Sequence, residues 1–216
     1  MGRRKLVRRM REQLALATAR RCYRVASPED ARPMSRYLAV QGELERSGLV
    51  MLADFAVGPD GEPPLWITRV LVGERGTMCA CLVARVRAKR AELLIESYAQ
   101  ASSFVTCGWS QGGWAHSPSI YVQRVDAGPA SLVAYHRRFV RGVDRVAIAS
   151  PDDWIEQMER AQERERAWRA SQDPQALLEL DLVAMFGQHR AHEAARWARR
   201  IHAEAVPQAR ARRGND

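Results

Sequence analysis

The sequence contains no run of eighteen apolar residues, the length that a membrane-spanning helix needs, so we expect no transmembrane segment. Cysteine is scarce as well, because four residues in a chain of 216 are too few for a disulfide-dense secreted scaffold. No Walker loop, dinucleotide fingerprint or kinase motif occurs, which disfavours nucleotide chemistry and predicts no cofactor. The remaining composition, 46% hydrophobic and 27% charged, is typical of a globular chain.

Lysine is nearly absent, since only two of the 34 basic residues are lysine, and together with abundant alanine this bias indicates GC-rich coding and a bacterial source. The net charge of +9 is unevenly distributed along the chain. Residues 1–24 carry +8 and residues 188–216 carry +4, whereas residues 25–187 carry −3. We therefore expect acidic partners for the two ends, while the folded middle is mildly acidic.

The first ten residues, MGRRKLVRRM, have the charges of an export signal, but the apolar run that follows is short and ends at Arg20. We therefore expect no export and a cytoplasmic location. In that reducing compartment the four cysteines are expected to be free thiols rather than disulfides.

A basic amphipathic helix is predicted over residues 1–24. Its apolar stripe consists of Leu6, Val7, Met10, Leu14 and Ala17, which share one face at 3.6 residues per turn. Arg4, Arg8 and Arg11 lie on the polar face, where they could contact nucleic acid or an anionic membrane surface. Two other roles stay open, docking of the stripe on the rest of the protein and pairing with a partner helix.

Residues 25–149 are predicted to form an α+β domain. It begins with helices between Ser27 and Gly48, and a later helix covers residues 129–141. Short β-branched and aromatic runs separated by turn residues predict strands at 49–57, 65–72, 77–86, 91–98, 102–107 and 119–125. Because the connections are too short for crossover helices, we expect an antiparallel β-meander of five to six strands with the N-terminal helices packed on one face.

A two-helix hairpin is predicted over residues 150–206. Ser150 and Pro151 begin its first helix, Asp173 and Pro174 begin the second, and residues 207–216 form a disordered basic tail. The narrow apolar stripe and dense alternating charge of the hairpin are typical of pairing with another chain, so we expect a protein partner there.

The segment Gly108-Trp-Ser-Gln-Gly112 matches G-x-S-x-G, the nucleophile elbow of α/β-hydrolases. The elbow requires a helix directly after its serine, and Pro118 followed by a strand opposes one. We therefore expect a hairpin loop, although a helix over residues 114–120 would favour the hydrolase.

The enzyme alternative is a small serine hydrolase with Ser110 as its nucleophile. His116 or His136 would act as the base, and Asp126 or Asp144 would orient that base. The sequence shows no other catalytic motif, so we favour a non-enzymatic function over this hydrolase.

The same Gly/Trp loop is a candidate ligand-binding segment. It gathers aromatic and polar side chains within eight residues, and such loops often contact ligands. Its candidate binding residues are Trp109, Ser110, Gln111, Trp114 and His116.

No metal site is expected. Cys79 and Cys81 are two apart on one strand, a poor spacing for zinc, and Cys107 and His116 do not complete a zinc knuckle. The pair His189 and His192 lacks the His-Glu-x-x-His order. Buried free cysteine is the expected role of the thiols.

Taken together, these patterns favour a non-enzymatic intracellular protein-interaction module with basic termini that prefer acidic partners. The alternatives are the serine hydrolase built on Ser110, and nucleic-acid or anionic-membrane-surface binding through residues 3–24.

Overall fold

The computed structural model describes residues 21–85, 91–108, 116–186 and 192–199. They fall into two compact units. The first contains the described residues from 21 to 164 other than 116–117, and the second contains residues 116–117, 165–186 and 192–199. Residues 1–20 of the helix predicted over residues 1–24, and the tail of residues 207–216, lie outside the described part of the chain.

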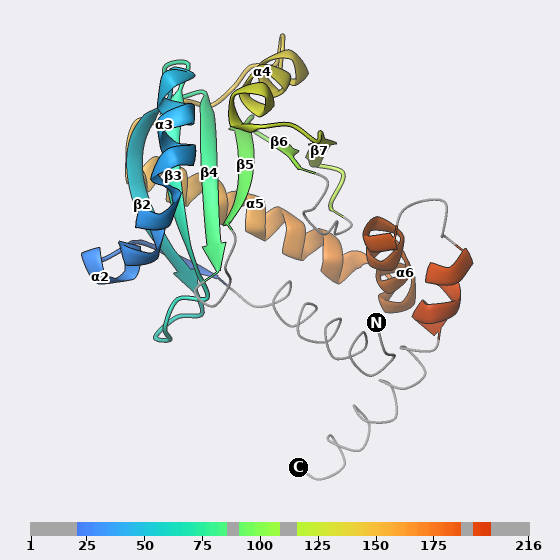
Figure 1. Ribbon diagram of the computed structural model, residues 1–216. Helices are drawn as coiled ribbons and strands as arrows, with labels where there is room; N and C mark the ends of the chain where they lie inside the picture. Colours follow the sequence, from blue (N-terminus) through green and yellow to red (C-terminus); the bar gives the residue numbers. More distant parts are fainter. Residues whose placement is uncertain (1–20, 86–90, 109–115, 187–191, 200–216) are drawn as a thin grey trace. The chain divides into compact units, whose positions relative to one another are not determined.

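The first unit is built on a seven-stranded sheet whose spatial order follows the chain (Figure 1). Neighbouring strands from β1 to β6 are antiparallel, while β6 and β7 are parallel. The fold is therefore α+β with a mostly antiparallel sheet. The strands are β1 Cys22–Val25, β2 Val50–Gly58, β3 Trp66–Gly73, β4 Met78–Arg85, β5 Ala91–Tyr98, β6 Ser103–Cys107 and β7 Ile120–Arg124.

Two predictions about the sheet were wrong. Residues 22–24 were assigned to the N-terminal helix, but they form the edge strand β1, which buries Tyr23 edge-to-face against Trp154. The last two strands were expected to form a hairpin, but they run parallel, because the connection at residues 108–119 is long enough to return to the opposite end of the sheet. A hairpin loop at the GWSQG segment is thereby excluded.

The helices begin at the predicted caps and prolines, except that the α-helix expected from Pro33 begins only at Leu38. Ser27 caps α2 (Pro28–Ala31) in a capping box, and a 3₁₀ turn, η1 (Arg32–Tyr37), leads into α3 (Leu38–Arg46). Gly48 then takes a φ of +88°, as expected for the residue that ends a helix. The remaining helices are α4 Pro129–Phe139, α5 Pro151–Ser171 and α6 Pro174–Phe186.

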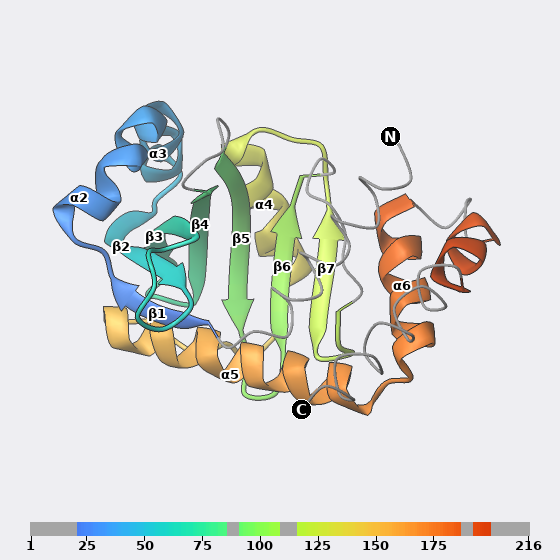
Figure 2. The same ribbon diagram turned by 90° about the horizontal axis from the view of Figure 1, so that it is seen from below.

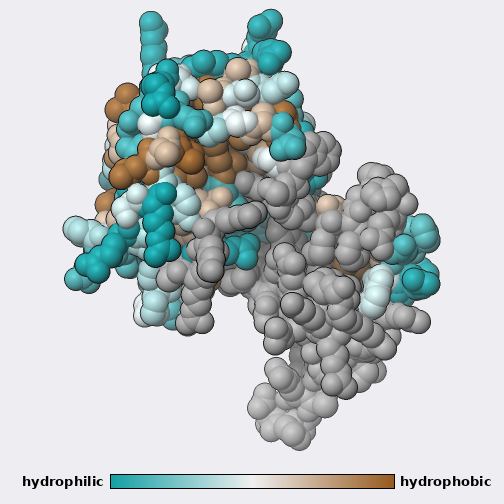
Figure 3. Space-filling model, viewed as in Figure 1, coloured by the Kyte–Doolittle hydropathy of each residue, from teal (hydrophilic) through white to brown (hydrophobic). Residues whose placement is uncertain are grey.

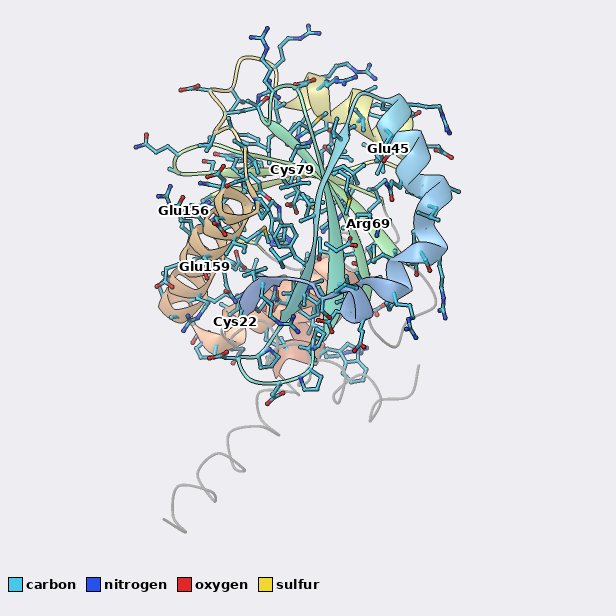
Figure 4. All side chains as sticks on the ribbon, turned by 90° about the vertical axis from the view of Figure 1, so that its left-hand side faces the viewer. Cys22, Glu45, Arg69, Cys79, Glu156 and Glu159 are labelled. Atoms are coloured by element: carbon cyan, nitrogen blue, oxygen red, sulfur yellow. The ribbon has the colours of Figure 1, made fainter. Side chains whose placement is uncertain are left out.

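Helices cover both faces of the sheet in the first unit. Helices α3 and α4 lie on one face and the first part of α5 lies on the other, as Figures 2 and 4 show. Alternate strand residues fill the two cores. The α4-side core contains Leu44, Leu49, Leu71, Met78, Ala80, Ile95, Leu132 and Val133, and the α5-side core contains Phe55, Val57, Val70, Cys79, Cys81, Tyr98, Ile148 and Trp154.

A largely buried ion pair links strands β2 and β3, and its arginine also bonds to α3. The Arg69 guanidinium donates two hydrogen bonds to Asp54, of 2.8 and 2.7 Å, and a third of 2.7 Å to Gln41 of α3. Figure 4 shows Arg69 on the same side of the sheet as α3. Apolar side chains also reach the molecular surface on this face (Figure 3), among them the partly buried Val40 and Leu93.

The second unit has a buried ionic centre. Arg169 donates to both carboxylate oxygens of Asp181, at 3.0 and 3.1 Å, and to Glu165 at 2.9 Å. This bidentate pair connects the end of α5 to α6 and supports the predicted helix pair up to residue 186. Residues 192–199 are helical, but the continuity expected across residues 187–191 lies outside the described residues.

Candidate functional site

Most residues of the predicted sites lie outside the described part of the chain. These are Trp109, Ser110, Gln111, Trp114, Arg4, Arg8 and Arg11. His116 is described and half-buried, and the backbone N–H of the next residue, Ser117, donates to Glu165 at 2.8 Å. Residues 116–119 are not helical and β7 begins at Ile120, so the described part of the segment does not favour a nucleophile elbow.

His136, the other proposed base, lies in a closed polar network on the α4 side of the sheet. Its Nδ1 is 2.9 Å from the Thr106 hydroxyl and its Nε2 is 3.0 Å from the Ser97 hydroxyl. The Ser97 hydroxyl is in turn 2.8 Å from the carbonyl oxygen of Thr77. His136, Ser97 and Thr106 are all fully buried, so the structure pairs His136 with two hydroxyl groups and with neither Asp126 nor Asp144.

Counting protons fixes the state of this network. A carbonyl oxygen only accepts, so the single Ser97 proton goes to Thr77, and His136 Nε2 must carry the hydrogen that it donates to Ser97. Nδ1 is then bare and accepts the Thr106 proton at 2.9 Å, so the 3.3 Å contact between the Thr106 hydroxyl and Gln123 Oε1 cannot use that proton. Burial lowers the pKa of His136 to about 4, which keeps the ring neutral. A catalytic base would take the serine proton, whereas here the histidine donates to the serine.

A second buried cluster lies on the opposite face of β5. The Tyr98 hydroxyl is 2.5 Å from Glu96 Oε2, and the Cys81 thiol is 3.5 Å from the same oxygen. Burial raises the pKa of the Glu96 carboxyl. Burial also raises the pKa of Cys81 and of Cys79 far above the ordinary thiol range, so these cysteines are neutral rather than nucleophilic. Among the described residues, no three His, Cys, Asp or Glu side chains form a metal-binding group.

Strand β7 forms one edge of the sheet in the first unit. The Ser103 N–H donates to the Ser119 carbonyl and the Val125 N–H donates to the Cys107 carbonyl, both at 2.8 Å. Alternate residues of a strand face the same neighbour. Tyr121 and Gln123 therefore turn their backbone groups toward β6.

The backbone N–H and C=O groups of the intervening residues, Ile120, Val122 and Arg124, point away from the sheet. Strand β7 is the last in the sheet order, and no described residue pairs with it on that side. Unpaired strand edges of this kind are templates for another strand.

Aromatic side chains occupy the α4 side of this edge. Tyr121 is 48% exposed and stacks on Phe104 of β6, with ring centroids 5.0 Å apart and planes 12° from parallel. Phe139 of α4 meets Phe104 edge-to-face at 5.8 Å. The edge therefore presents an apolar, partly exposed ring surface on this side.

Two arginines occupy the α5 side. Arg124 of β7 lies across from Cys107 in the strand register. Arg164 of α5 donates through Nη2 to the Ser103 hydroxyl at 3.2 Å, while its Nε is buried and lacks a hydrogen-bond partner. Burial and the neighbouring Arg160 lower the pKa of Arg164. Within the described ranges neither Arg124 nor Arg164 forms an ion pair with a carboxylate.

Sequence reasoning missed this edge. The alternation of Ile120, Val122 and Arg124 on one side with Tyr121 and Gln123 on the other was visible. The sequence did not reveal that β7 is the edge strand, because this depends on β7 running parallel beside β6.

Comparisons with protein-family models, with curated proteins and with solved structures give no match to this chain. Among the helices that the structure describes, none is long and apolar enough to cross a membrane.

Proposed function

We propose that the protein is a non-enzymatic interaction module that binds an extended segment of a partner protein as an additional strand beside β7. The observation that carries this proposal is the row of outward backbone groups on Ile120, Val122 and Arg124. In strand addition these main-chain groups supply affinity, while the side chains on the two faces supply selectivity.

The buried polar groups support binding rather than catalysis. Ser97 and His136 are enclosed and satisfied by each other and by their neighbours, so neither is available to a substrate. Glu96 and Cys81 share a buried cluster in which the neutral forms are favoured. Of the two candidate bases for a hydrolase built on Ser110, His136 has both ring nitrogens already engaged.

Two further surfaces stay predictions. The C-terminal helix pair was expected to bind a protein partner, and on α6 Leu180 is 45% exposed. The basic segment of residues 3–24 was expected to prefer acidic surfaces, anionic lipid or nucleic acid. The cytoplasmic location likewise remains a prediction.

The proposal is tested by amide NMR on the ¹⁵N-labelled full-length chain. The probes are the peptide GTTVIVTTG, its acidic relative GTEVIVETG and a strand-breaking control, GTTVPVTTG. At least one of the first two peptides should shift the amide signals of Ile120, Val122 and Arg124 and slow their hydrogen exchange, whereas the proline peptide should do neither.

A matched pair of variants tests the location. Val122→Pro removes an outward N–H from β7 and should abolish binding, because proline is tolerated on an edge but cannot donate. Val25→Pro makes the same change on β1, the other sheet edge, where residue 25 also turns its N–H outward, and should leave binding intact. If neither peptide protects the β7 amides, or if Val122→Pro binds like the unmodified chain, the proposal is wrong.

A further inference from the structure

We infer that the segment accepted by β7 is an acidic peptide with two carboxylates four residues apart and apolar residues between them. This inference rests on the proposed strand addition and specifies its ligand. It follows from the two arginines on the α5 side of the edge and from the aromatic rings on the α4 side.

Arg164 and Arg124 place positive charge on the α5 side of the β7 edge. Arg164 keeps a buried Nε without a partner, and among the described residues its hydrogen bond is to the neutral Ser103 hydroxyl. Arg124 lies at the other end of the same strand pair, across from Cys107. A half-buried guanidinium without a carboxylate carries a desolvation cost that an incoming anion would offset, and arginine is suited to bidentate carboxylate recognition.

The spacing of the arginines sets the spacing of the acids. Arg164 bonds to Ser103 and Arg124 faces Cys107, two positions that are four residues apart on β6. At about 3.3 Å per residue, this separation is roughly 13 Å along the strand. Side chains at positions i and i+4 of an added strand share one face and span the same length, so carboxylates at these positions lie level with both arginines along the strand, in either strand direction.

The residues between the acids meet an apolar surface on both faces. Position i+2 lies on the α5 side beside Ile120 and Val122. On the α4 side, one of the positions i+1 and i+3 lies beside the exposed Tyr121 and its stacked neighbour Phe104. Cross-strand aromatic and β-branched pairs stabilise such contacts, so valine, isoleucine or an aromatic residue is expected there.

A peptide fits this edge better than a nucleic acid. Arginines beside exposed aromatic rings also occur in single-strand nucleic-acid sites. The outward groups of β7, however, alternate N–H donors with C=O acceptors, and a peptide backbone matches both. A phosphate backbone offers acceptors only, which would leave the three carbonyls of Ile120, Val122 and Arg124 without donors.

Fluorescence anisotropy with labelled peptides tests the inference on the full-length chain at low salt. The probes are GTEVIVETG, the neutral GTQVIVQTG and the charge-reversed GTKVIVKTG. The acidic peptide should bind about tenfold more tightly than the neutral one, and more tightly still than the basic one, with the preference weakening as salt is added.

Protein variants locate the charge effect. Arg124→Gln and Arg164→Gln should each reduce the preference for the acidic peptide roughly threefold or more. Arg138→Gln is the matched control, because Arg138 is exposed on α4 and contacts the Tyr135 ring away from the strand edge. It should leave the preference unchanged.

The outcomes separate the two claims. If the three peptides bind equally and Val122→Pro still abolishes binding, strand addition stands and the acidic specificity is wrong. If no peptide binds or protects the β7 amides, both claims fall. Tight binding of a nine-nucleotide oligothymidylate that depends on Arg124, without peptide binding, would overturn the peptide assignment in favour of nucleic acid.

Discussion

Gly76 and Ile148 are in direct backbone contact. The Ile148 N–H donates to the Gly76 carbonyl at 2.9 Å, and a Cβ placed on Gly76 would lie 2.4 Å from the Ile148 carbonyl oxygen. Gly76 lies in the turn between β3 and β4 with a φ of +85°. The segment that leads from α4 to α5 can therefore lie against this turn only because residue 76 has no side chain.

Gly76→Ala should destabilise the first unit severely, by about 3 kcal/mol or more, because backbone must move in addition to the cost of the left-handed conformation. Gly142→Ala is the control, since Gly142 has a similar φ of +80° but nothing within 4 Å of an added Cβ. That variant should lose only about 1 kcal/mol. Urea unfolding of both variants measures the difference, and equal losses would contradict the close contact.

His136 should remain neutral well below its ordinary pKa. Its pKa is about 4 in the folded chain, while the unfolded histidine protonates near 6.5. Between these values only the unfolded chain gains the proton, so acidification from pH 6.5 toward pH 4 should cost about 3 kcal/mol of stability through this residue. Ring ¹⁵N NMR should show the Nε2–H form at pH 7 and no titration above pH 5. A titration midpoint near 6.5 for His136, the ordinary value of an unfolded histidine, would contradict the enclosed network.

Glu96→Gln should not destabilise the protein at neutral pH. Burial raises the pKa of Glu96, so its contribution to stability is complete below the ordinary carboxyl pKa and is lost as pH rises through the folded value. Glutamine keeps the size of the side chain without the charge. Urea unfolding at pH 8 should therefore show equal or greater stability for the variant, with a smaller advantage at pH 5.

Tyr98→Phe is the companion variant. It removes the hydroxyl that bonds Glu96 and should cost about 1 kcal/mol. A loss of several kcal/mol in Glu96→Gln at pH 8 would instead show that the ionised carboxylate is required.

Asp181→Asn should weaken the second unit. Asp181 is fully buried and accepts two hydrogen bonds from Arg169. Asparagine removes the negative charge that balances the buried Arg169 guanidinium, so the free energy of unfolding should fall by about 3 kcal/mol. Glu156→Gln removes an exposed i,i+4 pair with Arg160 and should change stability by less than about 0.5 kcal/mol. Hydrogen exchange of the α6 amides checks both variants. Unchanged exchange in Asp181→Asn would show that other contacts hold α6.

Local patterns predicted the elements better than their pairing. Ser27, Pro129 and Pro151 begin helices because capping and proline geometry act within a few residues. The strands from β2 to β7 were also predicted near their observed bounds, because alternation and turn residues are local. The parallel pairing of β7 was missed because strand direction depends on the path of residues 108–119, which residue patterns do not specify.

The candidate site was less predictable for the same reason. His136 was recognised as a possible base, but its partners Ser97 and Thr106 come from two different strands, 39 and 30 residues away. The edge formed by Ile120, Val122 and Arg124 likewise exists only once β7 lies outermost in the sheet. Residues 109–114 were predicted as a site because their side chains are of types that often bind ligands. The edge residues are candidates only because of their position in the sheet.

Amide hydrogen exchange along β7 of the free full-length chain shows whether this edge is open to an added strand. The amides of Tyr121, Gln123 and Val125 face β6 and should be protected, whereas those of Ile120, Val122 and Arg124 face outward and should exchange rapidly. This alternation is expected only of an uncovered edge strand. Uniform protection of all six amides would show that the edge is already paired within the chain and would contradict strand addition at β7.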